Sequence, residues 1–153
     1  TSCNRRTRYD ASVMSEPVFS DIRIEWDWVK PQIEQILSEQ PELTYRPEDV
    51  YASCINGSAR LVTLDKNKFA VIEVTTDPFT YKKSLNIWVA GVTEDGKSGN
   101  TVLSYTGFFE KVARELDCSY LECSTSKVSL GRLYSSVGMS LKLQTYVKDL
   151  GEA

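Results

Sequence analysis

The stretch that decides the fold runs from Ser84 to Leu116 and reads SLNIWVAGVTEDGKSGNTVLSYTGFFEKVAREL. An apolar strand leads into a polar loop that contains glycine, and the loop leads into an amphipathic helix. The start of a helix presents free backbone N–H groups and the positive end of the helix dipole. The stretch therefore predicts an anion site where the loop meets the helix.

The same loop matches a nucleotide-binding pattern, because Gly91 to Ser98 reads G-x-x-x-x-G-K-S. A Walker loop needs its helix to begin at the Gly-Lys-Ser, but Gly99 and Asn100 follow here, and both are poor residues for a first helical turn. Glu94 and Asp95 would also place two carboxylates beside the phosphates. A P-loop nucleotide binder is therefore a minor alternative, and a solvent-exposed turn with glycine and charge is a more ordinary interpretation than the P-loop.

The composition is that of one globular domain. The chain has 153 residues, of which 41% are hydrophobic and 25% charged. The net charge of −3 argues against broad nucleic-acid binding. No apolar run is long enough to span a membrane, so no membrane association is expected. We expect a flexible tail over residues 1–17, without the apolar core of a secretory signal, and a domain over 18–150. The tail carries Arg5, Arg6 and Arg8, either as a solvated cluster or as a docking segment.

Histidine is absent from the sequence, which removes Ser-His-Asp catalysis, Cys-His catalysis and histidine metal ligation. The four cysteines, Cys3, Cys54, Cys118 and Cys123, form no C-x-x-C pair. We therefore expect no metal site, and we expect free, buried thiols in a reducing cytosol.

Hydrophobic periodicity predicts one strand, two helices, three strands, and then helix, strand, helix and strand. The expected strands are 18–24, 60–64, 68–75, 84–92, 119–124 and 140–147, and the expected helices are 28–40, 47–56, 101–116 and 126–137. Pro31 places the first helix start near Trp28, because proline is tolerable in the first turn, and Gly57 is the expected C-terminal cap of the second helix. The order predicts a single α/β domain with a mixed central sheet flanked by helices.

Three short motifs near the C-terminus carry a family resemblance: Leu133-Tyr134, then Gly138-Met139, then Tyr146-Val147-Lys148. Together with the element order, they resemble the GNAT-like acyl-CoA N-acyltransferase superfamily, over roughly residues 22–149. The segments WDWVKPQIEQIL and KKSLNIWVAG are further similar to small GNAT-like proteins of tailed bacteriophages, some of them virion-associated. The resemblance implies a GNAT-like fold, phage virion proteins as partners, and a location in the host cytoplasm or the virion.

The resemblance also implies acetyl-CoA as cofactor. It would lie along Val89 and Gly91 and at the loop that follows, formed by Gly96, Lys97, Ser98, Gly99, Asn100 and Thr101. This loop departs from the family's usual Q/R-x-x-G-x-G/A spacing. Thr125 and Ser126 also stand where the family often has an asparagine. Tyr134 matches the family tyrosine that protonates the leaving thiolate, and its alternative role is that of a core aromatic residue.

The general base must be a carboxylate or a relayed water, because the sequence has no histidine. Glu73 lies in the apolar strand FAVIEV, and Glu122 lies in YLEC. Both are candidate bases, and the alternative is an outward-facing or paired glutamate. Asn86 and Trp88 share one face of the central strand and are candidates for an acceptor pocket, although Trp88 also suits core packing.

Two main hypotheses follow from these residues. The first is an acyl-CoA-dependent N-acetyltransferase of phage origin. The second is a non-catalytic virion-associated or accessory protein that acts by protein–protein contact. The degraded Gly96–Thr101 loop favours the second, whereas Tyr134 and Glu122 keep the first open.

Overall fold

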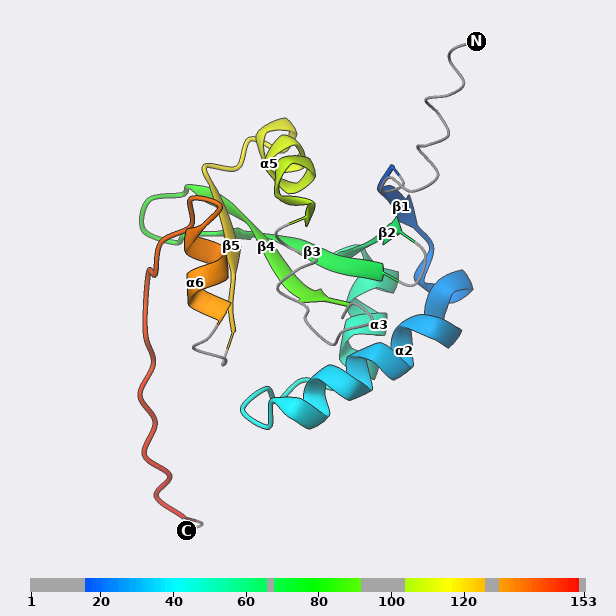
Figure 1. Ribbon diagram of the computed structural model, residues 1–153, viewed down its shortest axis with the longest axis horizontal. Helices are drawn as coiled ribbons and strands as arrows, with labels where there is room; N and C mark the ends of the chain where they lie inside the picture. Colours follow the sequence, from blue (N-terminus) through cyan, green and yellow to red (C-terminus); the bar gives the residue numbers. More distant parts are fainter. Residues whose placement is uncertain (1–15, 66–67, 92–103, 126–129, 152–153) are drawn as a thin grey trace.

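The computed structural model describes residues 16–65, 68–91, 104–125 and 130–151, and these form an α/β fold around one mixed sheet (Figure 1). The elements in chain order are β1 (Val18–Ser20), α2 (Ile22–Glu39), α3 (Pro47–Asn56), β2 (Arg60–Asp65), β3 (Lys68–Thr76), β4 (Lys83–Ala90), α5 (Thr106–Glu115), β5 (Tyr120–Cys123) and α6 (Leu130–Ser135).

The sheet has the strand order β1-β2-β3-β4-β5. Pairing is antiparallel from β1 to β4, and β4 pairs with β5 in parallel. The parallel pair needs a crossover, which α5 supplies. The predicted single α/β domain with a mixed sheet and flanking helices is confirmed.

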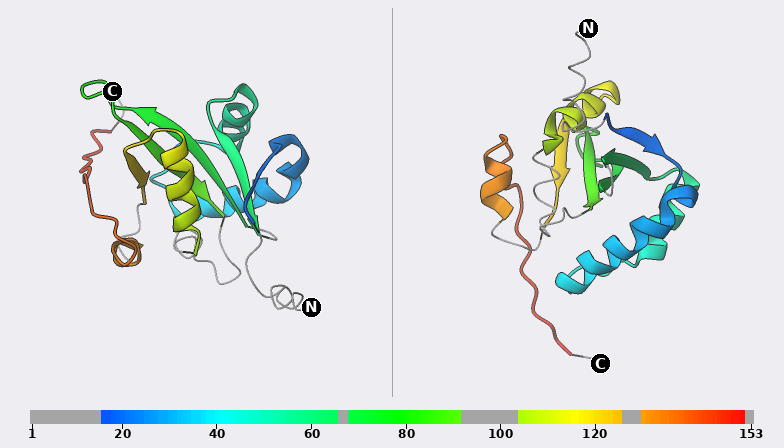
Figure 2. Two further views of the ribbon diagram at one scale, coloured as in Figure 1. Left: turned by 90° about the horizontal axis from the view of Figure 1, so that it is seen from above. Right: turned by 45° about the vertical axis from the view of Figure 1, so that its right-hand side comes forward.

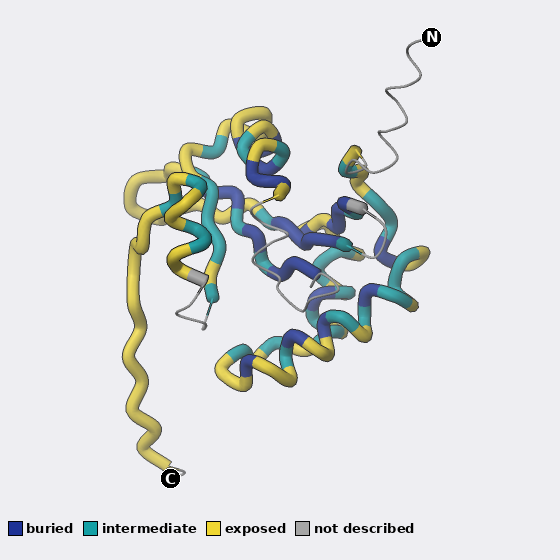
Figure 3. The backbone as a smooth tube through the Cα atoms, in the orientation of Figure 1, coloured by how far each residue is buried: buried dark blue, intermediate teal, exposed yellow. Residues whose placement is uncertain are grey.

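Helices cover both faces of the sheet, and each face has its own hydrophobic cluster (Figure 2). On one face, Val29 and Ile33 of α2 and Val50 of α3 are fully buried against the sheet. On the other face, Phe109 and Val112 of α5 pack on the sheet. Buried residues accordingly concentrate on the central strands and on the inner sides of the helices (Figure 3).

The first helix begins earlier than predicted, and this corrects two sequence predictions. Asp21 caps it by accepting a hydrogen bond from the Arg23 N–H at 2.9 Å, so the expected strand 18–24 is shortened to Val18–Ser20. Pro31 therefore lies inside α2 and not in its first turn. It sits on the exposed side, where water can bond the carbonyl that loses its helical partner.

The second helix is predicted correctly. It spans Pro47–Asn56, and Gly57 ends it in the left-handed conformation at φ +88°. The four sequence-predicted strands from 60 to 124 are confirmed with shifts of one or two residues at their ends. The cysteines in the described residues (Cys54, Cys118 and Cys123) are free as expected, but they are half-buried and not buried.

The predicted final strand, 140–147, is wrong. Residues 140–150 are exposed and form neither helix nor strand, and the chain leaves the body after α6 (Figures 1 and 3). A strand needs a neighbour to take up its backbone hydrogen bonds, and this segment has none among the described residues. The last helix covers Leu130–Ser135 of the expected 126–137, and 126–129 lie outside the described residues.

Candidate active site

The candidate site lies where β4 and β5 separate. The two strands pair from Ser84↔Tyr120 to Ile87↔Cys123, and β5 ends there. The strand β4 continues to Ala90, so its last residues have no β5 neighbour. A gap therefore opens between the carboxyl ends of two parallel strands, which is a common place for ligands in α/β sheets.

A β-bulge at Trp88 interrupts the alternation of side chains between the two faces of β4. Val71 pairs with Val89 but Ile72 pairs with Ile87, which leaves Trp88 as the extra residue. Before the bulge, Ile87 packs in the cluster on the α5 side. After it, Val89 joins Trp88 on the α2 and α3 side, so two successive side chains of β4 face the same way.

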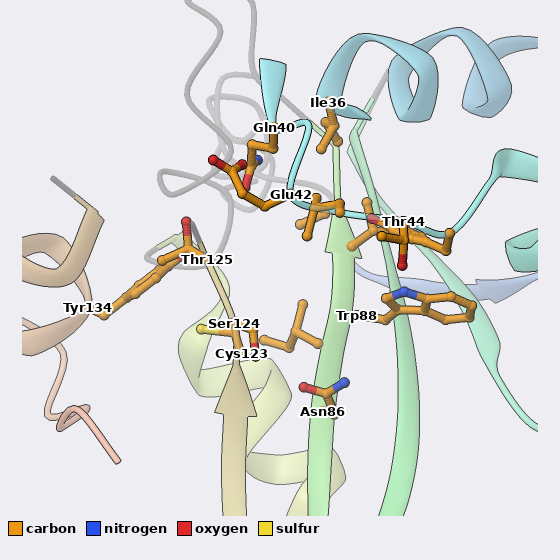
Figure 4. Close-up of a pocket in the computed structure, with 15 residues that line it drawn as sticks. Ile36, Gln40, Glu42, Thr44, Asn86, Trp88, Cys123, Ser124, Thr125 and Tyr134 are labelled. Atoms are coloured by element: carbon orange, nitrogen blue, oxygen red, sulfur yellow. The ribbon is translucent and has the colours of Figure 1, made fainter. Parts of the chain in front are cut away.

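A cavity of about 380 Å³ occupies this gap (Figure 4). The loop between α2 and α3 lines one side of it, and α6 reaches it from the other face of the sheet. Both faces contribute, which is consistent with the separation of the two strands. The lining residues are Ile36, Gln40, Glu42, Leu43, Thr44, Tyr45, Asn86, Ile87, Trp88, Val89, Ala90, Cys123, Ser124, Thr125 and Tyr134.

Tyr134 and Cys123 meet on one wall of the cavity. Burial raises the pKa of Tyr134 well above its usual range, and the adjacent Cys123 adds to the effect. Burial also raises the pKa of Cys123, against a smaller lowering by the hydrogen bond with Tyr134. The Tyr134 hydroxyl is therefore kept protonated, and it lies beside the Cys123 thiol on the wall of the cavity.

The opposite wall is aromatic. The rings of Tyr45 and Trp88 lie 5.2 Å apart, centroid to centroid, and burial raises the pKa of Tyr45 to about 12. Figure 4 shows Trp88 beside Thr44, across the cavity from Tyr134. Apart from Trp88, this wall could not be predicted from the sequence, because the α2–α3 loop has no periodicity that links it to β4.

A row of polar side chains crosses the sheet on the same face as Trp88. Register places Glu73 opposite Asn86 and Asn86 opposite Glu122. The Asn86 amide donates to Glu73 Oε2 at 2.8 Å, and the Ser84 hydroxyl donates to Glu122 Oε2 at 3.2 Å. The Lys142 ammonium also donates to Glu122, at 2.9 Å. Both predicted bases are thus paired side chains, and Asn86 connects their row to the cavity.

Of the other site residues predicted from the sequence, some line the cavity and some lie outside the described residues. Val89 and Thr125 line the cavity. Gly91 lies just past β4, where its N–H donates to the Phe69 carbonyl at 2.7 Å. A Cβ at Gly91 would come within 2.6 Å of Gln32 Oε1, so close packing already explains the glycine. The predicted loop Gly96–Thr101, the Walker-like string from Val92 onward and Ser126 lie outside the described residues.

One carboxylate of the cavity was missed by sequence analysis. Glu42 is the single Asp or Glu among the lining residues that the structure describes. It follows Pro41 in the connection between α2 and α3, and it is exposed in the structure although it lines the cavity. Nothing in its spacing links it to β4 or α6.

Within 16–65, 68–91, 104–125 and 130–151, no group of three or more His, Cys, Asp or Glu side chains is placed to hold a metal ion. None of the helices in those ranges combines the length and the apolar composition needed to cross a membrane.

Comparison with solved structures defines the class of fold: the chain has the fold of the GNAT acetyltransferases. A tetramutant of the BH1408 protein from Bacillus halodurans matches with a TM-score of 0.69 at 16% identity, covering 89% of this chain and 100% of that chain. The ribosomal-protein-alanine N-acetyltransferase of Brucella melitensis matches at 0.64 and 13%, covering 89% and 100%. A GNAT family acetyltransferase of Staphylococcus aureus matches at 0.60 and 7%, covering 90% and 98%.

Neither a family model nor a curated protein matches the sequence. Identities this low establish the fold alone. The comparisons give no support to the bacteriophage resemblance.

Proposed function

We propose that the protein is an acyl-CoA-dependent N-acyltransferase whose reaction takes place in the gap between β4 and β5. The observation that carries the proposal is the cavity at the separated strand ends, with the neutral hydroxyl of Tyr134 on its wall. Acyl-CoA would supply an acyl thioester, which an amine acceptor converts to an amide.

The described residues fit such a ligand in two ways. The last residues of β4 lack a β5 neighbour, and no strand of the described residues pairs with this edge, so it suits an amide-containing arm that adds as a peptide adds to a sheet. The cavity is also large enough for a thioester and a small acceptor group. Phosphate binding would fall to the Gly96–Thr101 loop that the sequence predicts.

Each proton transfer has a candidate side chain. When the C–N bond forms and the C–S bond breaks, Tyr134 donates its hydroxyl proton to the leaving sulfur. Glu42 accepts the proton that the acceptor amine loses, because it is the carboxylate lining the described part of the cavity. Glu73 and Glu122 flank Asn86 and remain candidate bases that act through the polar row.

Thermal unfolding tests the proposal directly. A ligand at 100 times its Kd stabilises the folded state by about 2.7 kcal/mol, which for a domain of this size raises Tm by roughly 5–10 °C. We expect such a shift with acetyl-CoA and none with ATP–Mg²⁺. Release of free CoA in the presence of amine acceptors should accompany it.

Two other outcomes identify the alternatives. A Tm shift with ATP–Mg²⁺ alone would contradict the proposal and restore the P-loop interpretation. No shift with either ligand, together with co-purification with phage virions, would support the non-catalytic virion-associated role that the resemblance implies.

A further inference from the structure

The ammonium group of Lys142 is held on the polar face of the sheet by Glu122. Lys142 Nζ donates to Glu122 Oε2 at 2.9 Å, and the Ser84 hydroxyl donates to the same oxygen at 3.2 Å. The Glu122 side chain is 31% exposed, whereas that of Lys142 is 76% exposed. The carboxylate is therefore positioned by the sheet, and the amine that it holds reaches it from outside the sheet.

This ammonium lies beside the candidate active site. Glu122 stands opposite Asn86 in the register of β4 and β5, and Asn86 lines the cavity (Figure 4). Neighbouring strands lie about 4.8 Å apart, so the carboxylate that holds Lys142 is one strand away from a side chain of the cavity. Glu122 is also a candidate base. A primary amine in contact with a candidate base is what an acceptor needs before it attacks a thioester.

The segment that carries Lys142 leaves this side chain room to move. Residues 140–150 are exposed and form neither helix nor strand, and no strand of the described residues pairs with them (Figure 1). The ammonium of a lysine also stands on a flexible four-carbon stem. A shift of the amine from Glu122 along the polar row toward Asn86 therefore breaks no strand pairing that the structure describes.

We infer that Lys142 is a modification site, and that the chain transfers an acyl group from acyl-CoA to its own Lys142 Nζ. The inference rests on the proposed function and adds an acceptor that belongs to the same chain. Glu122 takes one proton from the ammonium, and the neutral nitrogen bonds to the carbonyl carbon of the thioester. The C–S bond breaks, and the leaving sulfur takes the proton of Tyr134.

The protons of this step balance. The second proton that the nitrogen loses, on forming the amide, restores the Tyr134 hydroxyl through solvent, and the proton on Glu122 is released. The products are an amide at Lys142, free CoA and one proton. Acylation also removes the positive charge of Lys142, so the ion pair with Glu122 is lost and the carboxylate becomes available to other acceptors.

Mass spectrometry of the full chain after incubation with acetyl-CoA, without an added amine, tests the inference. We expect Lys142 to be acetylated at least about 100-fold faster than Lys148, because general base catalysis contributes about that much. Lys148 is the matched comparison, since it is exposed on the same segment but is not the lysine that Glu122 holds. Equal rates at the two lysines would indicate uncatalysed acetylation and would overturn the inference.

Uncatalysed acetylation does not by itself favour Lys142. The hydrogen bond and the charge of Glu122 raise the pKa of Lys142, and Asp77 adds a smaller effect. A raised pKa keeps the amine protonated, and a protonated amine does not attack a thioester. Faster acetylation at Lys142 than at Lys148 therefore reports catalysis by the site and not the reactivity of an exposed lysine.

Two pairs of variants check the assigned groups. Lys142→Arg should abolish the acetylated peptide, while Lys148→Arg should keep the wild-type rate. Glu122→Gln should lower the rate at Lys142 to that at Lys148, whereas Glu34→Gln, an exposed glutamate of α2, should not change it. An unchanged rate in Glu122→Gln would overturn the inference.

The dependence on protein concentration shows whether the acceptor belongs to the same chain. The rate per molecule should stay constant on dilution, because Lys142 and Glu122 meet within one chain. A rate that rises with protein concentration would indicate transfer between copies and would contradict the inference. A Tm shift with acetyl-CoA and CoA release with added amines, but without acetylated Lys142, would overturn this inference alone. Loss of all three signals would overturn the proposed function as well.

Discussion

Asn86 and Glu73 are joined across neighbouring strands by a hydrogen bond of 2.8 Å from the amide nitrogen to Oε2. The bond leaves the Asn86 side chain tied to β3, although Asn86 also lines the cavity. The side chain of Asn86 therefore connects the cavity with the row of polar residues formed by Glu73, Asn86 and Glu122. This arrangement separates the roles of the three candidate carboxylates in a way that mutation can measure.

Replacement of each carboxylate by glutamine should identify the general base. General base catalysis contributes roughly 100-fold to 10,000-fold, and we expect a loss of kcat in this range for Glu42→Gln. Glu73→Gln should weaken the hydrogen bond that positions Asn86, and it should reduce kcat less than Glu42→Gln does. Rates of CoA release at saturating acyl-CoA measure the effect, with Glu34→Gln, an exposed glutamate of α2, as the matched control. Full activity in Glu42→Gln together with loss in Glu122→Gln would transfer the role to Glu122.

The substitution Tyr134→Phe removes the hydroxyl that we assign as proton donor and keeps the ring. We expect kcat to fall by about 100-fold or more, while acetyl-CoA still raises Tm, because binding does not depend on the transferred proton. Steady-state kinetics and thermal unfolding on the same preparation check both parts. The control is Tyr81→Phe, since Tyr81 is 78% exposed on the β3–β4 connection. Unchanged kcat would show that Tyr134 is a packing residue.

Gly91 should not tolerate a methyl group. A Cβ there would lie 2.6 Å from Gln32 Oε1 and 2.7 Å from Phe69 Cδ1, and Phe69 is fully buried. We expect Gly91→Ala to lower the free energy of unfolding by about 1–3 kcal/mol, as overpacking does. Urea denaturation measures the loss. The control Gly107→Ala has no atom within 4 Å of its Cβ and lies in α5, so it should be neutral or stabilise by up to about 1 kcal/mol.

Tyr45 should make stability fall at alkaline pH. Burial raises its pKa from 10.0 to about 12, so the folded state keeps the phenol neutral where the unfolded state ionises it. This contribution is complete below about pH 10 and is lost as pH rises toward 12. The free energy of unfolding should therefore fall more steeply above pH 10 for the wild type than for Tyr45→Phe. Parallel slopes in urea titrations of the two proteins would contradict this expectation.

Local signals account for the parts of the fold that sequence predicted well. Pro47 at the start and Gly57 at the end define α3, and period-two apolar runs define β2, β3 and β4. Predictions failed where a second local signal outweighed the first, or where the element needed a partner strand that the local sequence does not specify. Pro31 predicts a helix start near Trp28, but the Asp21 cap and the buried Ile22 extend α2 to an earlier start. The alternation over 140–147 is strand-like, but a strand needs a neighbouring strand to pair with it. Among the described residues, no strand pairs with this segment.

The sequence by itself determined the α/β order, the absence of histidine chemistry and the placing of Tyr134, Glu73, Glu122 and Asn86 on regular elements, because these depend on residue type and period. Tertiary structure decided which of them meet. The bulge at Trp88 and the early end of β5 open the cavity, and both arise from strand register, which pairs residues far apart in the chain. The packing of α2 and α3 on the sheet brings Glu42 and Tyr45 to the site from a loop with no local signature.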